Sequence, residues 1–240
     1  MADMNLGPSA PTALDYFSTL VSSDQQFPLM EAAISLAQDE YPQLDLQAVL
    51  SEVDQLQARL HRRWRGETDP LRTLGLLNQF FFKDLGFAGN VNDYYDPDNS
   101  FMHAVLRTRR GIPISLAVLW LELAASVGLR VHGVGFPGHF LVKVMTSQVA
   151  GGQIVIDPFT GQVLDHDTLL ERLGPMRLTP SGMTEAQRQH AWLQRHLEPA
   201  RPRHIIARML RNLLEIYHTQ GDETRLRAVQ QRLDVLGDGV

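Results

Sequence analysis

The chain has no cysteine among its 240 residues. Disulfides, thiolate nucleophiles, iron–sulfur clusters and cysteine-based zinc sites are therefore excluded. A reducing compartment is compatible with this composition, and we expect a cytoplasmic protein. A surplus of positive charge is also missing, because 22 Lys and Arg residues stand against 27 Asp and Glu residues, for a net charge of −5. We expect no nucleic acid as a partner, since surfaces that bind nucleic acids are usually basic.

Long hydrophobic runs are scarce. Residues 112–129 form the most apolar stretch, yet it contains a proline, a serine and a glutamate and barely reaches the ~20 residues that a membrane span needs. This pattern indicates a buried core helix. The N-terminus has no positively charged segment and carries Asp3 and Asp15 where a signal peptide would be apolar. We therefore expect neither a signal peptide nor a membrane partner.

The charges that are present are distributed unevenly. Nine acidic residues and no basic ones precede Arg59, whereas the chain from Arg172 onward carries 11 basic and 7 acidic residues. Two interpretations are open. An acidic N-terminal layer can meet a basic C-terminal layer, within the chain or between chains, or the two can be unrelated solvated faces.

Apolar periodicity divides the chain into helical ends and a mixed centre. Helices are predicted over residues 28–41, 46–64, 70–82, 101–110, 113–127 and 167–173, with a long irregular loop over 85–100. Three β-rich runs predict a small antiparallel meander over 131–136, 139–145 and 153–157. A helical hairpin is predicted over 204–219 and 226–236. This order of elements indicates an α+β fold with an N-terminal helical layer.

Composition also suggests where the parts begin and end. Residues 1–12 have little apolar content, which is typical of a flexible leader. We expect a main domain over 13–182 and a helical tail over 183–240. A single hairpin cannot bury its own apolar face, so the tail is expected to dock on the main domain. The oligomeric state does not follow from the sequence.

A glycine-rich stretch raises the question of a cofactor. Residues 133–138, GVGFPG, have the glycine spacing of a dinucleotide site. Strand-like residues follow, however, where such a site needs a helix N-terminus to receive the pyrophosphate. We expect no cofactor and no bound metal.

Two polar residues stand at the ends of neighbouring strands. His139 begins the second β-rich run after Pro137-Gly138, and Asp157 ends the third. If these strands pair in an antiparallel sense, the Asp157 carboxylate can approach and orient the imidazole. Such a pair often assists a nucleophile at a helix N-terminus, here that of the buried helix near residues 113–115.

Four phrases resemble the SirB family of bacterial transglutaminase-like proteins over about residues 29–173. They are LNQFFFKDLGFAGNVNDYYDPDNS, VLRTRRGIPISLAVLWLELAASVGL, GVGFPGHFLVKV and IDPFTG. The hairpin sequence RMLRNLLEIYHTQGD is similar to the tetratricopeptide-like tail of such proteins. The resemblance implies a transglutaminase-like, papain-related core with a Cys-His-Asp triad. His139 and Asp157 match the last two triad positions.

The first triad position departs from the family pattern. Active relatives have Gly-x-Cys, an Ala four residues after the Cys and a Gly about eleven residues later. Gly111, Ala117 and Gly128 fit this spacing, so Pro113 occupies the cysteine position. Ser115 is the nearest hydroxyl, but two residues along a helix rotate a side chain by about 200°. Ser115 is either a serine nucleophile or a polar residue of the first helical turn.

Two functions are therefore expected as alternatives. The first is a non-catalytic, regulatory protein that binds a protein or peptide through the former active-site cleft. The second is a hydrolase or acyl transferase that acts on amide or isopeptide bonds through Ser115, His139 and Asp157. Candidate binding residues come from the loop that matches the family and from the helix after it: Tyr94, Tyr95, Asp96, Asn99 and Arg110.

Overall fold

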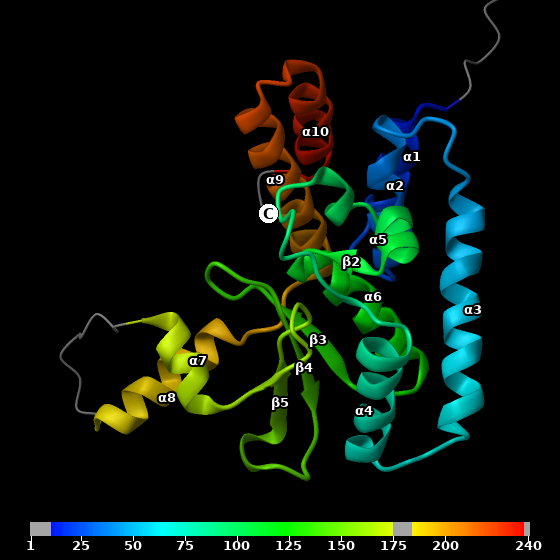
Figure 1. The fold of residues 1–240 in the computed structure, drawn as a ribbon. Coiled ribbons are helices and arrows are strands. Elements are labelled where there is room, and N and C mark those ends of the chain that lie inside the picture. Colours follow the sequence, from blue (N-terminus) through cyan, green and yellow to red (C-terminus); the bar gives the residue numbers. More distant parts are fainter. Residues whose placement is uncertain (1–10, 175–183, 238–240) are drawn as a thin grey trace, which may run out of the picture.

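The computed structural model describes residues 11–174 and 184–237. Helices occupy most of this length, and a small antiparallel sheet lies beside a central helix, in agreement with the predicted α+β class (Figure 1). Of the predicted leader, residues 1–10 lie outside the described part, and Thr12 already caps the first helix by accepting from the Asp15 amide at 3.1 Å. The predicted boundary between residues 182 and 183 also lies outside it. Among the described helices, none is long and apolar enough to cross a bilayer.

The N-terminal third forms a helical layer, as predicted. It contains α1 (Ala13–Leu20), α2 (Leu29–Ser35), the 3-10 turn η1 (Leu36–Asp39), α3 (Leu46–Trp64), α4 (Pro70–Asn78) and the π-helical turn η2 (Gln79–Asp84). Asp45 and Asp69 cap α3 and α4 by accepting from amides that have no partner within the helix. The helices predicted over 28–41 and 70–82 are thus each an α-helix followed by a turn of different pitch.

The segment predicted as an irregular loop contains short regular elements. These are β1 (Ala88–Gly89) and the 3-10 turn η3 (Pro97–Ser100). The helix α5 (Met102–Thr108) and the strand β2 (Arg110–Gly111) follow the loop, and β2 pairs with β1 in a parallel sense. Gly89 donates to the Phe159 carbonyl at 2.9 Å, and a Cβ at Gly89 would lie 2.3 Å from the Phe159 ring. Only glycine fits this approach. The helix α5 ends at Thr108, with the C-cap Arg109 at φ of 58°, and not at residue 110 as predicted.

The sheet follows the buried helix α6 (Pro113–Ser126), which Gly128 terminates with φ of +77°. Its strands are β3 (Val131–Val134), β4 (Leu141–Met145), β5 (Gln153–Ile156) and β6 (Val163–Leu164), antiparallel and in sequence order. Val142 pairs with Ile156, which sets the register of the two central strands. The predicted meander is confirmed, and the two-residue β6 is an addition. The helix α7 (His166–Leu173) comes next, close to its predicted bounds.

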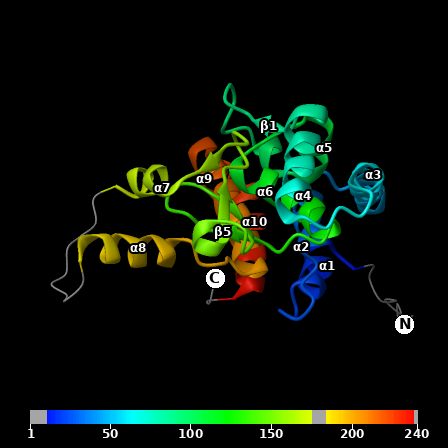
Figure 2. The same ribbon diagram turned by 90° about the horizontal axis from the view of Figure 1, so that it is seen from below.

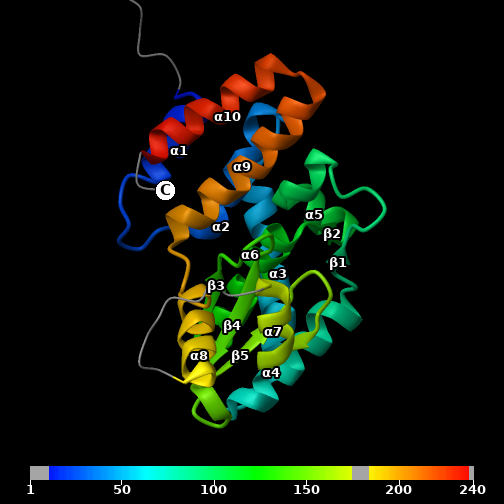
Figure 3. The same ribbon diagram turned by 90° about the vertical axis from the view of Figure 1, so that its left-hand side faces the viewer.

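The described residues 184–237 contain three helices: α8 (Glu185–His196), α9 (Pro202–Gln220) and α10 (Glu223–Leu236). The predicted hairpin is present as α9 and α10. Figures 1 and 3 show the hairpin packed beside α1 and α2, which are distant from it in the sequence. Figure 2 shows α7 and α8 on the side of the molecule opposite α3. The sheet and α6 lie between these two groups.

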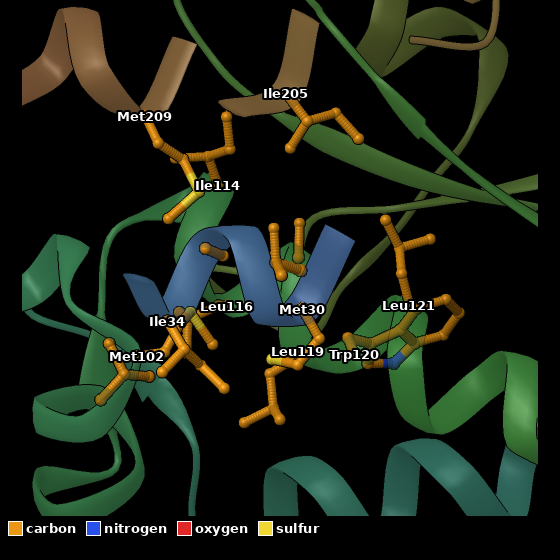
Figure 4. Packing of buried hydrophobic residues seen from close by; sticks show 14 of the residues in the cluster. Met30, Ile34, Met102, Ile114, Leu116, Leu119, Trp120, Leu121, Ile205 and Met209 are labelled. Carbon is orange, nitrogen blue, oxygen red and sulfur yellow. The ribbon is translucent and has the colours of Figure 1, made fainter. Parts of the chain in front are cut away.

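The main hydrophobic core surrounds α6. Leu116, Leu119 and Trp120 are fully buried there, and the Trp120 indole donates to Asn78 Oδ1 at 3.0 Å, which satisfies its polar atom. Figure 4 shows that α2, α5 and α9 contribute to the same cluster, through Met30, Ile34, Met102, Ile205 and Met209. The hairpin therefore shares the core of the main domain.

The acidic N-terminal and basic C-terminal regions meet within the chain. Arg232 of α10 is 1% exposed, and its Nε lies 2.5 Å from Asp39 Oδ2. Two further ion pairs across the same boundary join Arg203 to Asp24 and Arg225 to Glu40. The first of the two interpretations that the sequence allows is confirmed, with the contacts inside one molecule.

Candidate functional site

The strand register brings His139 and Asp157 together. His139 precedes β4 and Asp157 follows β5, so both lie at the same end of this antiparallel pair. His139 Nε2 is 2.8 Å from Asp157 Oδ1. The imidazole is 24% exposed and the carboxylate 2% exposed. The pairing predicted from the strand ends is confirmed, and we call these two residues the dyad.

The Asp157 carboxylate is held by more partners than the sequence indicated. Its Oδ1 also accepts from the Phe159 amide at 2.9 Å, and Oδ2 accepts from Arg172 of α7 at 3.2 Å. Burial raises the pKa of Asp157, but the hydrogen bond and the charge of His139, together with the other two donors, outweigh it and leave the pKa lowered. An ionised Asp157 accepts the proton of His139 Nε2, so Nδ1 is the ring nitrogen left to act as an acceptor or base.

The residues at the start of α6 supply no partner for that base. Pro113 is the first residue of α6 and is buried. Ser115 is 0% exposed, and its Oγ donates to the Asn99 carbonyl at 2.6 Å while accepting from the Ile112 amide at 3.1 Å. A nucleophilic hydroxyl would donate to the base instead. Of the two roles that the sequence allowed, these contacts are those of a first-turn cap.

The helix α9 reaches the dyad through Arg208. Its Nη2 donates to the His139 carbonyl at 2.6 Å and to the Phe136 carbonyl at 3.1 Å. Its guanidinium also lies 5.6 Å from the centre of the Phe140 ring. Burial lowers the pKa of Arg208, and the charge of Tyr94 opposes this. Arg208 thus fixes the turn between β3 and β4 that carries the imidazole.

The long loop places aromatic side chains near the dyad. The Tyr94 ring lies 6.0 Å from the Phe159 ring, and the Phe159 ring lies 6.4 Å from the imidazole. Tyr94 is 41% exposed and Tyr95 is 68% exposed. Burial is the main cause of the raised pKa of Tyr94. These two tyrosines form an accessible surface at the edge of the site.

The other three candidate binding residues shape the loops. Asp96 caps η3 by accepting from the Asp98 amide at 2.9 Å. Arg110 donates to the Gly86 carbonyl at 2.8 Å. Asn99 is 4% exposed, and its amide donates to the Asp93 carbonyl at 2.6 Å. The expectation that a partner contacts Asn99 is therefore corrected, because its side chain is enclosed by the loop that it holds.

Sequence reasoning missed Arg172 and Arg208. Both stand on helices whose apolar spacing was recognised, yet nothing in that spacing indicates which polar residue turns toward a distant strand end. Within residues 11–174 and 184–237, no group of three or more His, Asp or Glu side chains is arranged to hold a metal ion. The site is thus a buried carboxylate that is hydrogen-bonded to a partly exposed imidazole. Tyr94 is linked to this imidazole through the Phe159 ring, and Arg208 holds the His139 carbonyl.

Comparison with known proteins shows which sequences this chain is similar to. The sequence profile of the transglutaminase-like superfamily matches residues 47–211. A UPF0162 protein of Xylella fastidiosa is 39% identical over 201 residues, which is 81% of this chain and 66% of that protein. The UPF0162 protein of Pseudomonas aeruginosa is 29% identical over 214 residues, which is 87% of this chain and 72% of that protein. Human F-box only protein 21 is 42% identical over 72 residues, only 12% of its length.

The chain thus spans slightly less than two thirds of the length of the Xylella protein. No solved structure gives a significant match. The matched profile covers more than half of the chain and includes both residues of the dyad. This protein belongs to the transglutaminase-like superfamily.

Proposed function

We propose that this protein is a non-catalytic member of the superfamily that binds a protein or peptide at the surface around the dyad. The proposal rests chiefly on Ser115, whose fully buried hydroxyl donates to the Asn99 carbonyl at 2.6 Å. Pro113 has no nucleophilic atom and takes the cysteine position under the family spacing. The base is present, but the chain offers it no cysteine and no free hydroxyl at the start of α6.

Without a nucleophile, the dyad serves structure and recognition. The Asp157 carboxylate pins the imidazole and, through Arg172, also holds α7. The exposed imidazole edge presents an acceptor, and the nearby Tyr94 and Tyr95 hydroxyls present donors. Tyrosines suit such surfaces because they bury a large apolar area at low entropic cost and retain a polar end.

The setting of the protein follows from the resemblance to SirB proteins. That resemblance supports a regulatory role in the cytoplasm, with α9 and α10 as a second, tetratricopeptide-like recognition surface. The hairpin occurs once among the described residues and shares the core, so it would act as part of the same body. Because the chain spans 66% of the Xylella relative, this role is proposed for the described domain.

The catalytic part of the proposal is tested by transamidation and hydrolysis assays. A fluorescent primary amine is offered with a glutamine-containing acceptor protein, and amide release is followed by mass spectrometry. We expect no incorporation and no release from the unmodified chain or from His139→Ala. Turnover that disappears in both Ser115→Ala and His139→Ala would overturn the proposal and establish the serine hydrolase alternative.

The binding part is tested on an array of synthetic peptides. We expect a subset of peptides to retain the protein and Tyr95→Ala to lose that subset. Leu71→Ala is the control, since Leu71 is also a large exposed side chain, 38% exposed, on α4. Equal retention of the Tyr95 and Leu71 variants would contradict recognition at the dyad surface.

A further inference from the structure

Arg208 also lines a groove on the surface next to the dyad. Besides holding the His139 carbonyl, Arg208 lines an open groove of about 530 Å³ between the β3–β4 turn, the end of α8 and the first half of α9. The other ionisable side chains that line this basic groove are Arg195, His196, Glu198, His204 and Arg211. Five cationic or titratable nitrogen side chains therefore surround one carboxylate.

The walls of the groove are fixed by backbone contacts. The link from α8 to α9 runs against β3, where the Ala200 amide donates to the Gly133 carbonyl at 2.8 Å and Pro199 forms a bridge with Val134. Figure 3 shows α8 and α9 meeting beside β3. The groove is thus formed before any ligand binds, which lowers the entropic cost of binding.

Glu198 is the one carboxylate among the residues that line the groove. Glu198 raises the pKa of Lys143, while burial, the larger effect, lowers it. Lys143 is 6% exposed, and its amine donates to the Leu197 carbonyl at 2.6 Å. Lys143 is thus a further cation beside the groove, and the charge of Glu198 acts on it.

Arg208 is the cation that most requires an anion. It donates to two carbonyls and lies over the Phe140 ring, and it forms no ion pair with any described carboxylate. Arg195 is exposed at the end of α8 and makes no ion pair with any described residue. His196 donates through Nδ1 to the Trp192 carbonyl at 2.8 Å, which holds its ring at the groove. A ligand carboxylate would gain charge-assisted hydrogen bonds from this set.

We propose that the basic groove binds an acidic peptide segment of the partner, and so directs that partner onto the dyad surface. The inference deepens the proposed function and rests on it for the presence of a protein partner. A peptide fits better than a nucleic acid because the whole chain has a net charge of −5, whereas nucleic acids need an extended basic face. The groove volume suits a few side chains.

The test measures fluorescence anisotropy of a fluorescein-labelled hexaglutamate peptide titrated with the full chain. We expect binding that weakens as ionic strength rises from about 0.05 to about 0.5 M. Arg195→Glu should weaken it by about tenfold, and Arg195→Gln by less. Arg62→Glu is the matched control, because Arg62 is exposed on α3 and its substitution changes the net charge by the same amount. Its effect should stay below about twofold.

Three results would overturn the groove assignment. They are absence of binding at low salt, equal losses in the Arg195→Glu and Arg62→Glu variants, and a DNA hexanucleotide that displaces hexaglutamate at lower concentration than unlabelled hexaglutamate does. The mass of the peptide is measured after each titration. Covalent change of the peptide would contradict the proposed non-catalytic function, whereas unchanged peptide with no groove-specific binding would contradict the groove alone.

Discussion

Arg208 Nη2 donates a 2.6 Å hydrogen bond to the carbonyl of His139, across 69 residues of sequence. The bond joins the C-terminal hairpin to the turn that carries the catalytic-type imidazole. Because the same guanidinium also binds the Phe136 carbonyl, both ends of that turn depend on α9. The hairpin is therefore part of the scaffold of the site.

Replacing Arg208 should destabilise this turn. Arg208→Ala leaves two carbonyls without their donor, and hydrogen bonds to charged groups contribute about 1.5–3 kcal/mol. We expect a loss of about that size in the free energy of unfolding, measured in urea. Arg208→Lys should recover part of the loss, because a lysine reaches one carbonyl but lacks the guanidinium fork. A loss below about 0.3 kcal/mol for Arg208→Ala would show that the contact is not formed.

Gly111 and Ser115 should be energetically coupled. A Cβ at Gly111 would lie 2.7 Å from Ser115 Oγ, the hydroxyl that caps α6. Gly111→Ala should therefore cost about 1–3 kcal/mol, the usual cost of overpacking. Ser115→Ala alone should cost about 1 kcal/mol. Because this variant lacks the Oγ that the new methyl would meet, Gly111→Ala should cost less in it than in the unmodified chain. Additive losses in this double-mutant cycle would contradict the contact.

Removing the Asp157 carboxylate should weaken the whole strand end. Asp157→Asn changes the carboxylate that accepts hydrogen bonds from His139, Phe159 and Arg172. We expect the free energy of unfolding to fall by about 1–3 kcal/mol at neutral pH. Asp165→Asn is the control, since Asp165 caps α7 on the surface and should cost about 1 kcal/mol or less. Equal losses would show that the dyad contributes no more than an exposed cap.

The Asp157 contribution should also depend on pH. A carboxylate whose folded pKa is lowered stabilises the fold above its unfolded pKa of about 3.9 and loses that stabilisation as the pH falls toward the folded pKa. The stability difference between the unmodified chain and Asp157→Asn should thus shrink as the pH falls below about 4. Denaturant titrations across this range measure it. A difference that stays constant to about pH 2.5 would contradict the lowered pKa.

The sequence predicted the parts of this molecule that depend on local pattern. The buried helix from Pro113, the meander and the hairpin all follow from apolar spacing and glycine placement. The dyad could also be predicted, because His139 and Asp157 flank two strands that can pair only in one register with their apolar faces buried.

What could not be predicted depends on long-range contacts. Arg172 and Arg208 reach the site from helices whose rotation about the core is set by packing, so no nearby residue signals their role. The strand β1 pairs with β2, and its Gly89 also donates to the Phe159 carbonyl, 70 positions away in the sequence. The burial of Asn99 results from the folded loop around it, and a polar residue type in a loop would suggest exposure.

Removing the hairpin should expose the core that it shares. A chain ending at Pro199 loses fully or nearly fully buried side chains of α9, among them Ile205, Met209, Leu210 and Leu213. Each contributes about 1.5–3 kcal/mol on burial, so together they approach the whole stability of a domain, about 5–15 kcal/mol. We expect aggregation on expression. A soluble truncated chain with an unchanged thermal midpoint would contradict the shared core.

The central proposal is that Pro113, which takes the cysteine position under the family spacing, lies where a nucleophilic sulfur would face the imidazole. Because the chain has no cysteine, Pro113→Cys introduces its only thiol, and the ultraviolet absorbance of the thiolate reports its pKa without interference. We predict a pKa well below the ordinary value of about 8.5, returning toward that value in the Pro113→Cys/His139→Ala double variant. A thiol that titrates at or above about 8.5 and does not respond to His139 would contradict the account.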